Sequence, residues 1–237
     1  MTSKAELFRA LHHGGTPLVL PNAWDPVSAR IVAEAGFAAV ATSSGAVARI
    51  IGYDDGQLTP PAEMFTAVAR IAGAVDVPVT ADMEAGYGLP AREFAERLLE
   101  TGAVGCNLED SVDDVLVDPA QQADYLAEVR ATAGADLVIN ARIDNFVVGS
   151  TGDVVDAVRR GREYRRAGAD CTYPILAPLE VLPELVAGIG GPVNAHAAPA
   201  GPTPTELAAA GATRISYGTS VHKHLMEVLR QLLPTLK

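Results

Sequence analysis

The sequence predicts a closed barrel of eight parallel β-strands, each followed by an α-helix. Eight short apolar runs alternate with helical stretches, which is typical of a parallel sheet covered by helices. The length of 237 residues accommodates eight such units. The phosphate-binding patterns GxGxxG and GxxxxGK[ST] do not occur, which disfavours the alternative of an open doubly wound sheet. We therefore expect one barrel domain over residues 1–237, with two small domains as the other division of this length.

The predicted strands are continuous apolar runs that end in polar or small residues. Such runs indicate strands that are buried on both faces, as in a parallel sheet with helices around it. In chain order they cover residues 17–22, 38–44, 78–84, 105–111, 137–144, 171–176, 192–197 and 214–219.

The stretches between these strands have apolar residues at i, i+3 and i+4, which predicts amphipathic helices. Three of them carry a polar residue followed by proline at their start, a typical helix N-terminus. These pairs are Asp25-Pro26, Thr59-Pro60 and Thr203-Pro204. Glycines that favour a left-handed C-cap follow four of the helices, and these are Gly36, Gly102, Gly168 and Gly211.

The composition excludes several functional classes. The chain has 18 Lys and Arg against 29 Asp and Glu, a net charge of −11, which disfavours binding to nucleic acid or to an anionic membrane. No apolar run approaches the roughly 20 residues needed to cross a bilayer, and the N-terminal segment has no signal-peptide core. The two cysteines, Cys106 and Cys171, cannot form a disulfide framework or a CxxC metal pair. We expect a cytoplasmic protein without a nucleic-acid or membrane partner.

Acidic side chains gather at the C-terminal ends of the predicted strands, where the active site of such a barrel forms. Asp82 and Glu84 end the third strand two residues apart, so on a strand they face the same side. Glu109 ends the fourth strand, and Asp55 lies in the loop after the second. Neighbouring carboxylates repel each other unless a cation lies between them. An all-oxygen set favours Mg²⁺, or Mn²⁺, over Zn²⁺. The alternative interpretation is a solvated acidic rim, or carboxylates that pair with neighbouring arginines.

Other polar residues near these ends are candidates for binding or protonating a substrate. Arg142 ends the fifth strand and can hold a carboxylate in a two-pronged contact. His196, on the seventh strand, is the acid–base candidate, although a histidine bonded to a neighbouring carbonyl would fit the same position. Asn194 lies beside it as a substrate-binding amide.

Two further segments each have a structural and a functional interpretation. The small residues after the second strand offer N–H groups and hydroxyls to a substrate carboxylate, while a plain turn is the alternative; they are Ser43, Ser44 and Gly45. A run of arginines on a later helix is expected to form a solvated face or a subunit contact. It consists of Arg159, Arg160, Arg162, Arg165 and Arg166.

Several segments together resemble the isocitrate lyase / phosphoenolpyruvate mutase superfamily. They are NAWDPVSARIVAEAGF, ATSSG, GYDDG, TADMEAGYG, NLEDS and NARID, in that order, and the resemblance runs from about residue 5 to about residue 235. TADMEAGYG is the most specific segment, because the family pattern after the third strand is A-D-x-D/E-x-G-Y/F-G. The resemblance implies a barrel with bound Mg²⁺ that acts on small 2-oxo or 2-hydroxy carboxylates. It also implies that C–C or P–C bonds are made or broken through an enolate-like intermediate.

The resemblance implies a role for each matching residue. Asp82 matches the principal metal carboxylate, and Glu84 and Glu109 match positions that hold metal-bound waters. Asp55 matches an aspartate near the metal, and Arg142 matches the arginine that binds the carboxylate or phosphonate of the substrate. The segment that binds the carboxylate of the 2-oxo acid corresponds to Ser43, Ser44 and Gly45.

The chain departs from the known branches in the lid segment. The lyases have a K-[KR]-C-G-H motif with an acid–base cysteine, and the mutases have a Lys-x-Asn motif. The segment after Glu109, DSVDDVLVDPAQQADY, contains neither. Asp113, Asp114 and Asp118 lie in this segment, which we expect to fold over the site as a shield or to stay mobile.

The sequence thus predicts a Mg²⁺-dependent lyase that cleaves a C–C bond in a small 2-oxo or 2-hydroxy carboxylate. Three alternatives stay open: P–C chemistry on a phosphonopyruvate-like substrate, a pyruvate-enolate aldolase, and a non-catalytic barrel that binds a 2-oxo acid. Members of the superfamily form dimers and tetramers with the last helix exchanged between subunits. The resemblance therefore implies a homodimer or homotetramer.

Overall fold

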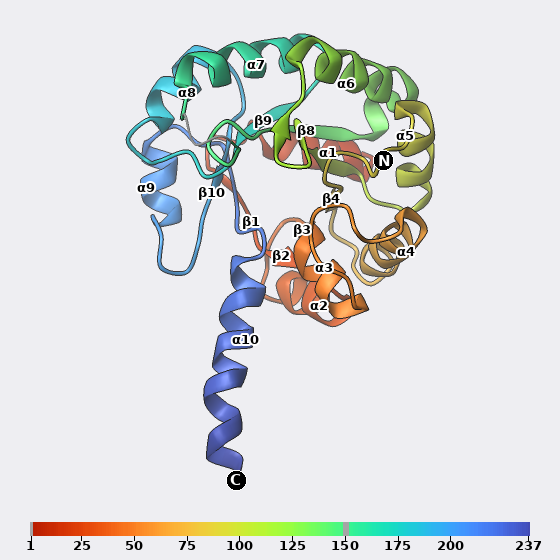
Figure 1. Cartoon of the computed structure of the whole chain (residues 1–237), viewed down its shortest axis with the longest axis vertical. Coiled ribbons are helices and arrows are strands. Elements are labelled where there is room, and N and C mark those ends of the chain that lie inside the picture. Colours follow the sequence, from red (N-terminus) through yellow and green to blue (C-terminus); the bar gives the residue numbers. More distant parts are fainter. Residues whose placement is uncertain (1, 149–151) are drawn as a thin grey trace.

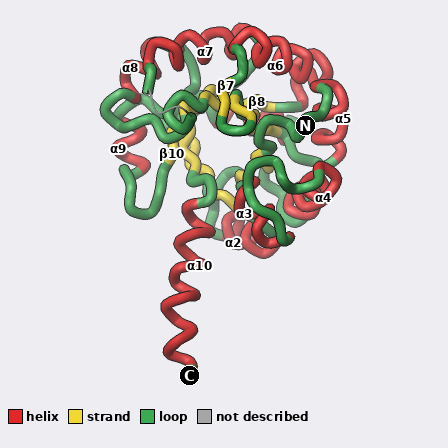
Figure 2. Tube along the Cα trace, viewed as in Figure 1, coloured by secondary structure: helices red, strands yellow, loops and turns green. Residues whose placement is uncertain are grey.

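A ring of parallel strands forms the centre of the molecule, and helices surround it (Figures 1 and 2). The computed structural model describes residues 2–148 and 152–237. One sheet has six strands in the order β2 (Asn22–Ala23), β3 (Val40–Thr42), β4 (Val79–Asp82), β5 (Gly105–Leu108), β8 (Val138–Ile143) and β9 (Cys171–Pro174). The other has three, in the order β1 (Leu18–Leu20), β11 (Arg214–Ser216) and β10 (Asn194–His196).

The two sheets join at both ends and close the barrel. β1 and β2 are consecutive pieces of one strand, interrupted at Pro21, because proline has no N–H to donate to a neighbouring strand. At the other junction, Thr172 of β9 pairs in parallel with Val193, the residue before β10. The described residues therefore provide eight strand positions at the eight predicted apolar runs, and the predicted barrel is confirmed.

Helices cover the outside of the barrel (Figure 1). They are α2 (Pro26–Glu34), α3 (Ser44–Ile51), α4 (Pro61–Ala72), α5 (Ala91–Glu100), α6 (Pro119–Ala133), α7 (Val154–Arg166), α8 (Leu182–Ile189) and α9 (Pro204–Ala209). Short 3₁₀ turns cover Gly134–Asp136 and Leu233–Leu236. α1 (Lys4–Leu11) precedes the first strand, and its Phe8 is fully buried against Leu18 and Val138 inside the ring. α1 thus closes the N-terminal end of the barrel.

Most of the predicted helix boundaries are confirmed. Asp25 and Thr203 cap α2 and α9 with their side chains, and all four predicted glycines have a positive φ directly after a helix. The Thr59 cap is wrong, because α4 begins at Pro61 and the residue at its N-cap is Pro60. Two consecutive prolines occupy this start, and the second takes the first helical position.

The segment after β5 forms a hairpin that the sequence did not predict. β6 (Ser111–Val112) pairs antiparallel with β7 (Val115–Leu116). The two residues of its turn, Asp113 and Asp114, have φ values of 50° and 58°, a left-handed pair that suits a tight hairpin. We call residues 111–116 the lid hairpin, because it lies beside the C-terminal ends of the strands.

The interior of the barrel has an apolar part and a polar part. Leu18, Leu20, Ala39, Ala41 and Val138 form the apolar part around Phe8. The polar part includes Arg214, which is fully buried, donates from Nη2 to Oδ1 of Asn107 at 3.0 Å, and lies over the Phe8 ring with its Cζ 5.8 Å from the centroid. This polar part of the interior leads to the C-terminal ends of the strands, where the residues of the predicted site lie.

α10 (Ser220–Leu232) extends away from the barrel and carries the C-terminus with it (Figures 1 and 2). Its exposed apolar side chains include Leu225, Val228, Leu229 and Leu232. Among the described residues, no helix combines the length and apolar character that crossing a membrane requires.

Candidate functional site

A cleft of about 240 Å³ opens beside the C-terminal ends of β4, β5 and β8. Glu84 and Glu109 line it from the strand ends, and Asp113 and Asp114 line it from the lid hairpin. Arg142 is the one positively charged side chain among the described residues that line it. The cleft therefore has a strong excess of negative charge and favours a cation.

Asp82 is held at the end of β4 by the start of α3. Its Oδ2 accepts hydrogen bonds from the N–H of Ser44 at 3.0 Å and from Ser44 Oγ at 2.9 Å, where the partial positive charge of the helix N-terminus favours a carboxylate. Its Oδ1 is buried and has no hydrogen-bond partner among the described residues. Burial raises the pKa of Asp82, and the nearby charge of Arg142 opposes that shift. One oxygen of this carboxylate is thus fixed and the other is available to a ligand.

Glu84 lies at the same edge, but its predicted position on the strand is wrong. β4 ends at Asp82, and Glu84 has a φ of 49°, so a left-handed turn, not strand alternation, sets its direction. Its carboxylate accepts hydrogen bonds from the Tyr87 hydroxyl at 2.9 Å and from the N–H of Gln57. Burial raises the pKa of Glu84 to about 7, with nearby Asp82 contributing. Glu84 therefore joins the loop after α3 to the loop after β4.

Glu109 and Arg142 form an ion pair across the ends of β5 and β8. Arg142 also forms a two-pronged contact with Asp144, with Nε–Oδ1 at 2.6 Å and Nη2–Oδ2 at 3.1 Å. Burial raises the pKa of Glu109, while the guanidinium opposes the shift. Arg142 is brought into the cleft as predicted, but its donors already contact two protein carboxylates. Its role toward a substrate stays a prediction.

A buried network behind Arg142 was missed by the sequence analysis. Oδ1 of Asp110 accepts the N–H of Asp144 at 2.8 Å, and its Oδ2 accepts from Arg160 at 3.0 Å and from the Tyr164 hydroxyl at 2.7 Å. Arg160 was expected on a solvated helix face, but it is 5% exposed and also pairs with Asp156. The prediction is wrong for Arg160, because α7 packs against β8 and β9 and buries this side of the helix. The spacing of Asp156 and Arg160, four residues apart on a helix, was the available signal.

Asp55 and the segment 43–45 lie together at the start of α3. A side-chain carbon on Gly45 would overlap the carboxylate of Asp55, so Asp55 rests directly on this glycine. Ser43 caps the helix by accepting from the N–H of Ala46 at 3.4 Å, and Ser44 binds Asp82. The serines predicted to bind a substrate carboxylate therefore bind protein groups in this structure, and their role toward a substrate stays a prediction.

The opposite side of the mouth carries uncharged polar groups. His196, at the end of β10, has its Nδ1 3.1 Å from the hydroxyl of Tyr173 on β9. Burial lowers the pKa of His196 to about 4, and the charges of Arg142 and Lys223 contribute. Asn194 lies deeper in the barrel, where its amide exchanges hydrogen bonds with Ser216 Oγ at 3.0 and 3.3 Å. His196 thus lies at the mouth, and Asn194 lies beneath it.

The charged residues of the mouth fit a hydrated Mg²⁺ ion. Within the described part of the chain, no three His, Cys, Asp or Glu side chains are placed to bind a metal directly. Mg²⁺, however, retains several waters and is often held by one or two protein carboxylates. The buried, unpartnered Oδ1 of Asp82 suits direct ligation, and Glu84 and Glu109 are suited to hold metal-bound waters. The predicted metal set stays a prediction with a donor chemistry that fits.

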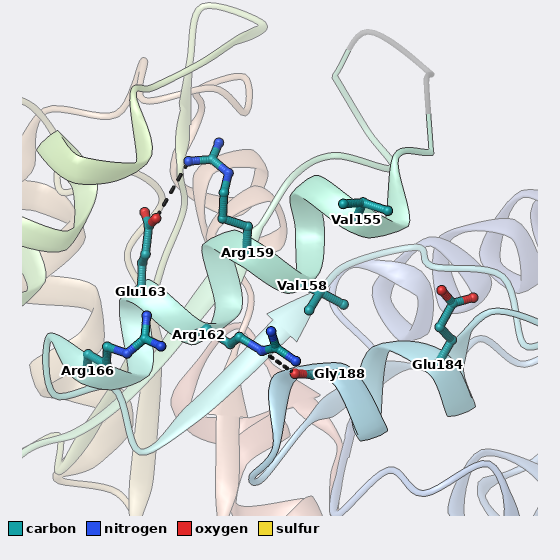
Figure 3. A pocket seen from close by; sticks show the side chains of 8 residues that line it. All are labelled: Val155, Val158, Arg159, Arg162, Glu163, Arg166, Glu184 and Gly188. Carbon is teal, nitrogen blue, oxygen red and sulfur yellow. Dashed lines mark hydrogen bonds and ion pairs between the residues drawn. The ribbon is translucent and has the colours of Figure 1, made fainter.

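A larger hollow, of about 400 Å³, lies on the outer surface between α7 and α8 (Figure 3). Val155, Val158 and Arg162 line it, and Arg162 donates from Nε to the carbonyl of Gly188 at 2.6 Å. It contains none of the predicted site residues. The chemistry of the strand ends is therefore not connected to this hollow.

Comparisons with known proteins agree on one family. Residues 8–236 match the sequence profile of the phosphoenolpyruvate phosphomutase family. An uncharacterised protein of Mycobacterium tuberculosis (strain ATCC 25618 / H37Rv) is 32% identical over 213 residues, which cover 90% of this chain and 81% of that protein. The 2-methylisocitrate lyase of Escherichia coli (strain K12) is 26% identical over 256 residues, which cover 97% of this chain and 85% of the lyase. A crystal structure of a "putative phosphonomutase" from Burkholderia cenocepacia J2315 has 38% identity and a TM-score of 0.91, covering 98% of this chain and 99% of that one.

Proposed function

The chain belongs to the phosphoenolpyruvate phosphomutase family, and from this membership we propose that it is a Mg²⁺-dependent enzyme that cleaves a C–C bond in a small 2-oxo or 2-hydroxy carboxylate. The observation that carries the proposal is the acidic cleft at the strand ends, which Glu84, Glu109 and a single cation, Arg142, line. Beside it, at the end of β4, Asp82 has a buried carboxylate oxygen without a hydrogen-bond partner among the described residues. An anionic substrate needs a cation to enter such a cleft, and Mg²⁺ supplies one. A bound Mg²⁺ would supply Lewis-acid polarisation of the 2-oxo group of the substrate.

The protein residues have separate roles in this proposal. Asp82 holds the metal directly, and Glu84 and Glu109 hold metal-bound waters. Asp55 and Arg142 complete the charged surroundings, with Arg142 binding the substrate carboxylate. His196 is the acid–base group. The carboxylate of the substrate is also bound by the mouth segment of Ser43, Ser44 and Gly45, with Asn194 beneath.

Two alternatives have support of their own. The 38% identity to the structure named as a "putative phosphonomutase" favours P–C chemistry, but a phosphonate carries more negative charge than Arg142 alone would balance. The lid hairpin carries Asp113 and Asp114 in place of the acid–base residues that the resemblance leads one to expect. That difference favours a barrel that binds a 2-oxo acid without turning it over.

Binding and turnover measurements distinguish these functions. Mg²⁺ and oxalate together are expected to raise the melting temperature more than either alone, because a ligand that binds the folded state stabilises it. Release of pyruvate from 2-methylisocitrate or from oxaloacetate would support C–C cleavage, whereas turnover of phosphonopyruvate alone would support P–C chemistry. Stabilisation without any turnover would support the binding barrel. Absence of Mg²⁺-linked stabilisation by oxalate would contradict the proposed site.

Arg142→Ala tests the substrate role of the cation in the cleft. We expect the variant to bind oxalate roughly 10- to 100-fold more weakly, since a charge-assisted hydrogen bond contributes about 1.5–3 kcal/mol. The variant should still bind the metal, and titration with Mn²⁺ as a paramagnetic probe measures this. An oxalate affinity equal to that of the wild type would contradict the role of Arg142.

We also propose a homodimer or homotetramer in which α10 packs against another subunit, and a cytoplasmic location. The support for the first is the exposed apolar face of α10, which includes Leu225, Leu229 and Leu232. Sedimentation measures the oligomeric state of the wild type and of Leu229→Glu, and the substitution should weaken the association. A monomeric wild-type protein would contradict it.

A further inference from the structure

Tyr173 and His196 form a pair on the wall of the mouth opposite the carboxylates. The Tyr173 hydroxyl lies 3.1 Å from Nδ1 of His196, and the tyrosine is 2% exposed. Tyr173 is the register partner of Arg142 on the neighbouring strand β8. The pair therefore borders the charged residues of the cleft without belonging to the carboxylate cluster.

The environment of the pair determines which nitrogen of His196 carries a proton. Arg142 from β8 and Lys223 from α10 are the charged groups that act on the ring, and with burial they disfavour its charged form. A neutral imidazole carries one proton. Among the described residues the Tyr173 hydroxyl has two polar neighbours, His196 Nδ1 at 3.1 Å and the side chain of Ser216. Ser216 Oγ already accepts from Asn194 Nδ2 and donates to Asn194 Oδ1, which leaves Nδ1 to accept from the buried tyrosine. Nδ1 is thus the acceptor, and the proton is on Nε2.

Nε2 is the free end of this arrangement. It has no hydrogen-bond partner among the described residues, and it is not one of the buried atoms that lack a partner. His196 itself is half-buried at the end of β10. The N–H of Nε2 is therefore accessible from the mouth of the barrel.

We propose that Tyr173 is a positioning residue that fixes His196 as the Nε2–H tautomer, and that His196 in this form donates the proton that completes the reaction. This inference rests on the proposed function, because it assigns a proton donor to the enolate-like intermediate. It gives a role to a tyrosine that the motif comparison leaves unassigned. It also supplies the acid that the lid hairpin does not contain.

The proton transfer balances within the pair. The Nε2–H bond breaks, and its proton forms a C–H bond with the carbon that holds the electron pair of the enolate. At the same time Nδ1 takes the proton of the Tyr173 hydroxyl, so the imidazole stays neutral. The negative charge moves to the Tyr173 oxygen, which is next to the register position of Arg142. Burial raises the pKa of Tyr173 and the charge of Arg142 opposes that shift, so this phenolate is a short-lived species. A proton from solvent then restores the hydroxyl.

The tautomer can be measured in the protein without metal or substrate. In protein with ¹⁵N-labelled histidine, we expect the His196 ring to show one protonated nitrogen, Nε2, throughout the range from pH 6 to pH 8 (about the unperturbed titration range of histidine). Tyr173→Phe removes the donor to Nδ1, so the two tautomers should exchange and both nitrogens should shift. A wild-type ring protonated on Nδ1, or an unchanged spectrum in Tyr173→Phe, would overturn the inference.

Proton exchange into a product analogue tests the donor role. With Mg²⁺ and pyruvate in D₂O, the wild type should exchange the methyl protons, and Tyr173→Phe should slow this at least about tenfold. The Mg²⁺-linked affinity for oxalate should stay within about twofold in the same variant, since the pair lies apart from the carboxylates. Tyr217→Phe is the matched control, because Tyr217 lies at the end of the next strand and its hydroxyl has no hydrogen bond among the described residues.

The outcomes separate the inference from the proposed function. Normal oxalate binding with equal exchange rates in wild type and Tyr173→Phe overturns the role of the pair and leaves the proposed function standing. No oxalate binding and no exchange in the wild type overturn both. If Tyr173→Phe does not fold, as judged by its melting curve, His196→Gln replaces it, with the same tenfold loss expected and wild-type exchange overturning the inference.

Discussion

The two walls of the barrel mouth handle polar groups in opposite ways. On the wall of β4, β5 and β8, charged residues lie next to one another: Glu84 and Glu109 face Arg142, and Asp110 and Arg160 support them from behind. On the wall of β9, β10 and β11, neutral groups such as Tyr173 and His196 bond to each other. Burial raises the pKa of Glu84 on the first wall and lowers the pKa of His196 on the second. Burial thus disfavours the charged form on both walls, and only the first wall can recover that cost by binding a cation.

Removing Asp82 should have the largest effect on this difference. We expect Asp82→Ala to abolish Mg²⁺-linked binding of oxalate, because the carboxylate oxygen that is free for the metal disappears. Isothermal titration of oxalate at fixed Mg²⁺ measures the loss. Asp76→Ala is the matched control, since Asp76 is exposed and precedes β4 at the other end of the barrel. If Asp82→Ala binds oxalate as tightly as the wild type does, the proposed metal site on the acidic wall is contradicted.

The acidic wall also depends on a cation behind it. Arg160→Met leaves Asp110 buried without its partner, and breaking a buried pair costs about 3–5 kcal/mol. We expect a loss of that size in the free energy of unfolding, measured by urea denaturation. Arg159→Met, on the neighbouring exposed position of α7, should change stability by less than about 1 kcal/mol. Equal effects of the two substitutions would show that the buried network does not support the wall.

Glu84 should make the metal-free protein less stable as pH rises. Its pKa is about 7 in the fold against a usual value of 4.5, so the folded state retains the proton longer than the unfolded state. The free energy of unfolding should therefore fall between about pH 4.5 and pH 7, by roughly 2–3 kcal/mol. Glu84→Gln should reduce this dependence in thermal melts with a chelator present. The part that remains comes from Glu109 and Asp110, whose pKa values burial also raises. A wild-type profile that is flat over this range would contradict the shift.

His196 should produce the reverse dependence on the neutral wall. Its pKa is about 4 in the fold against 6.5 ordinarily, so the folded state binds fewer protons than the unfolded state. Its contribution is fully present above pH 6.5 and is lost as pH falls towards 4, by roughly 2 kcal/mol after allowance for its partial exposure. His196→Asn should make the acid side of the stability profile less steep. A dependence that comes from His12, whose pKa burial also lowers to about 4, should remain. An unchanged acid side would show that the ring is not held neutral.

The sequence predicted the frame of the barrel well, because its signals are local. Apolar runs and a glycine such as Gly36 act within one turn or one strand, and they are found where they were expected. The hairpin turn at Asp113 and Asp114 was missed because neither glycine nor asparagine marks its left-handed backbone. Thr59 failed as a cap because a second proline follows the first.

The sequence predicted that several charged residues lie together, but not the contacts that they make. Asp82, Glu84, Glu109 and Arg142 meet at one edge, since parallel strands end at the same side of a sheet. Their partners come from distant segments, however, and periodicity does not report on these. Arg160 reaches Asp110 across 50 residues, and Tyr173 reaches His196 across 23. These pairings depend on how the helices and strands pack, which no local pattern encodes.

The close contact between Gly45 and Asp55 has a consequence for sequence comparison. Any side chain at position 45 would displace the carboxylate at position 55, so the two positions should vary together among relatives. Chains that retain both residues are expected to share the arrangement of this mouth. Chains that replace the glycine should also have lost the aspartate, and this covariation offers a simple marker for grouping relatives by the way their barrels are built.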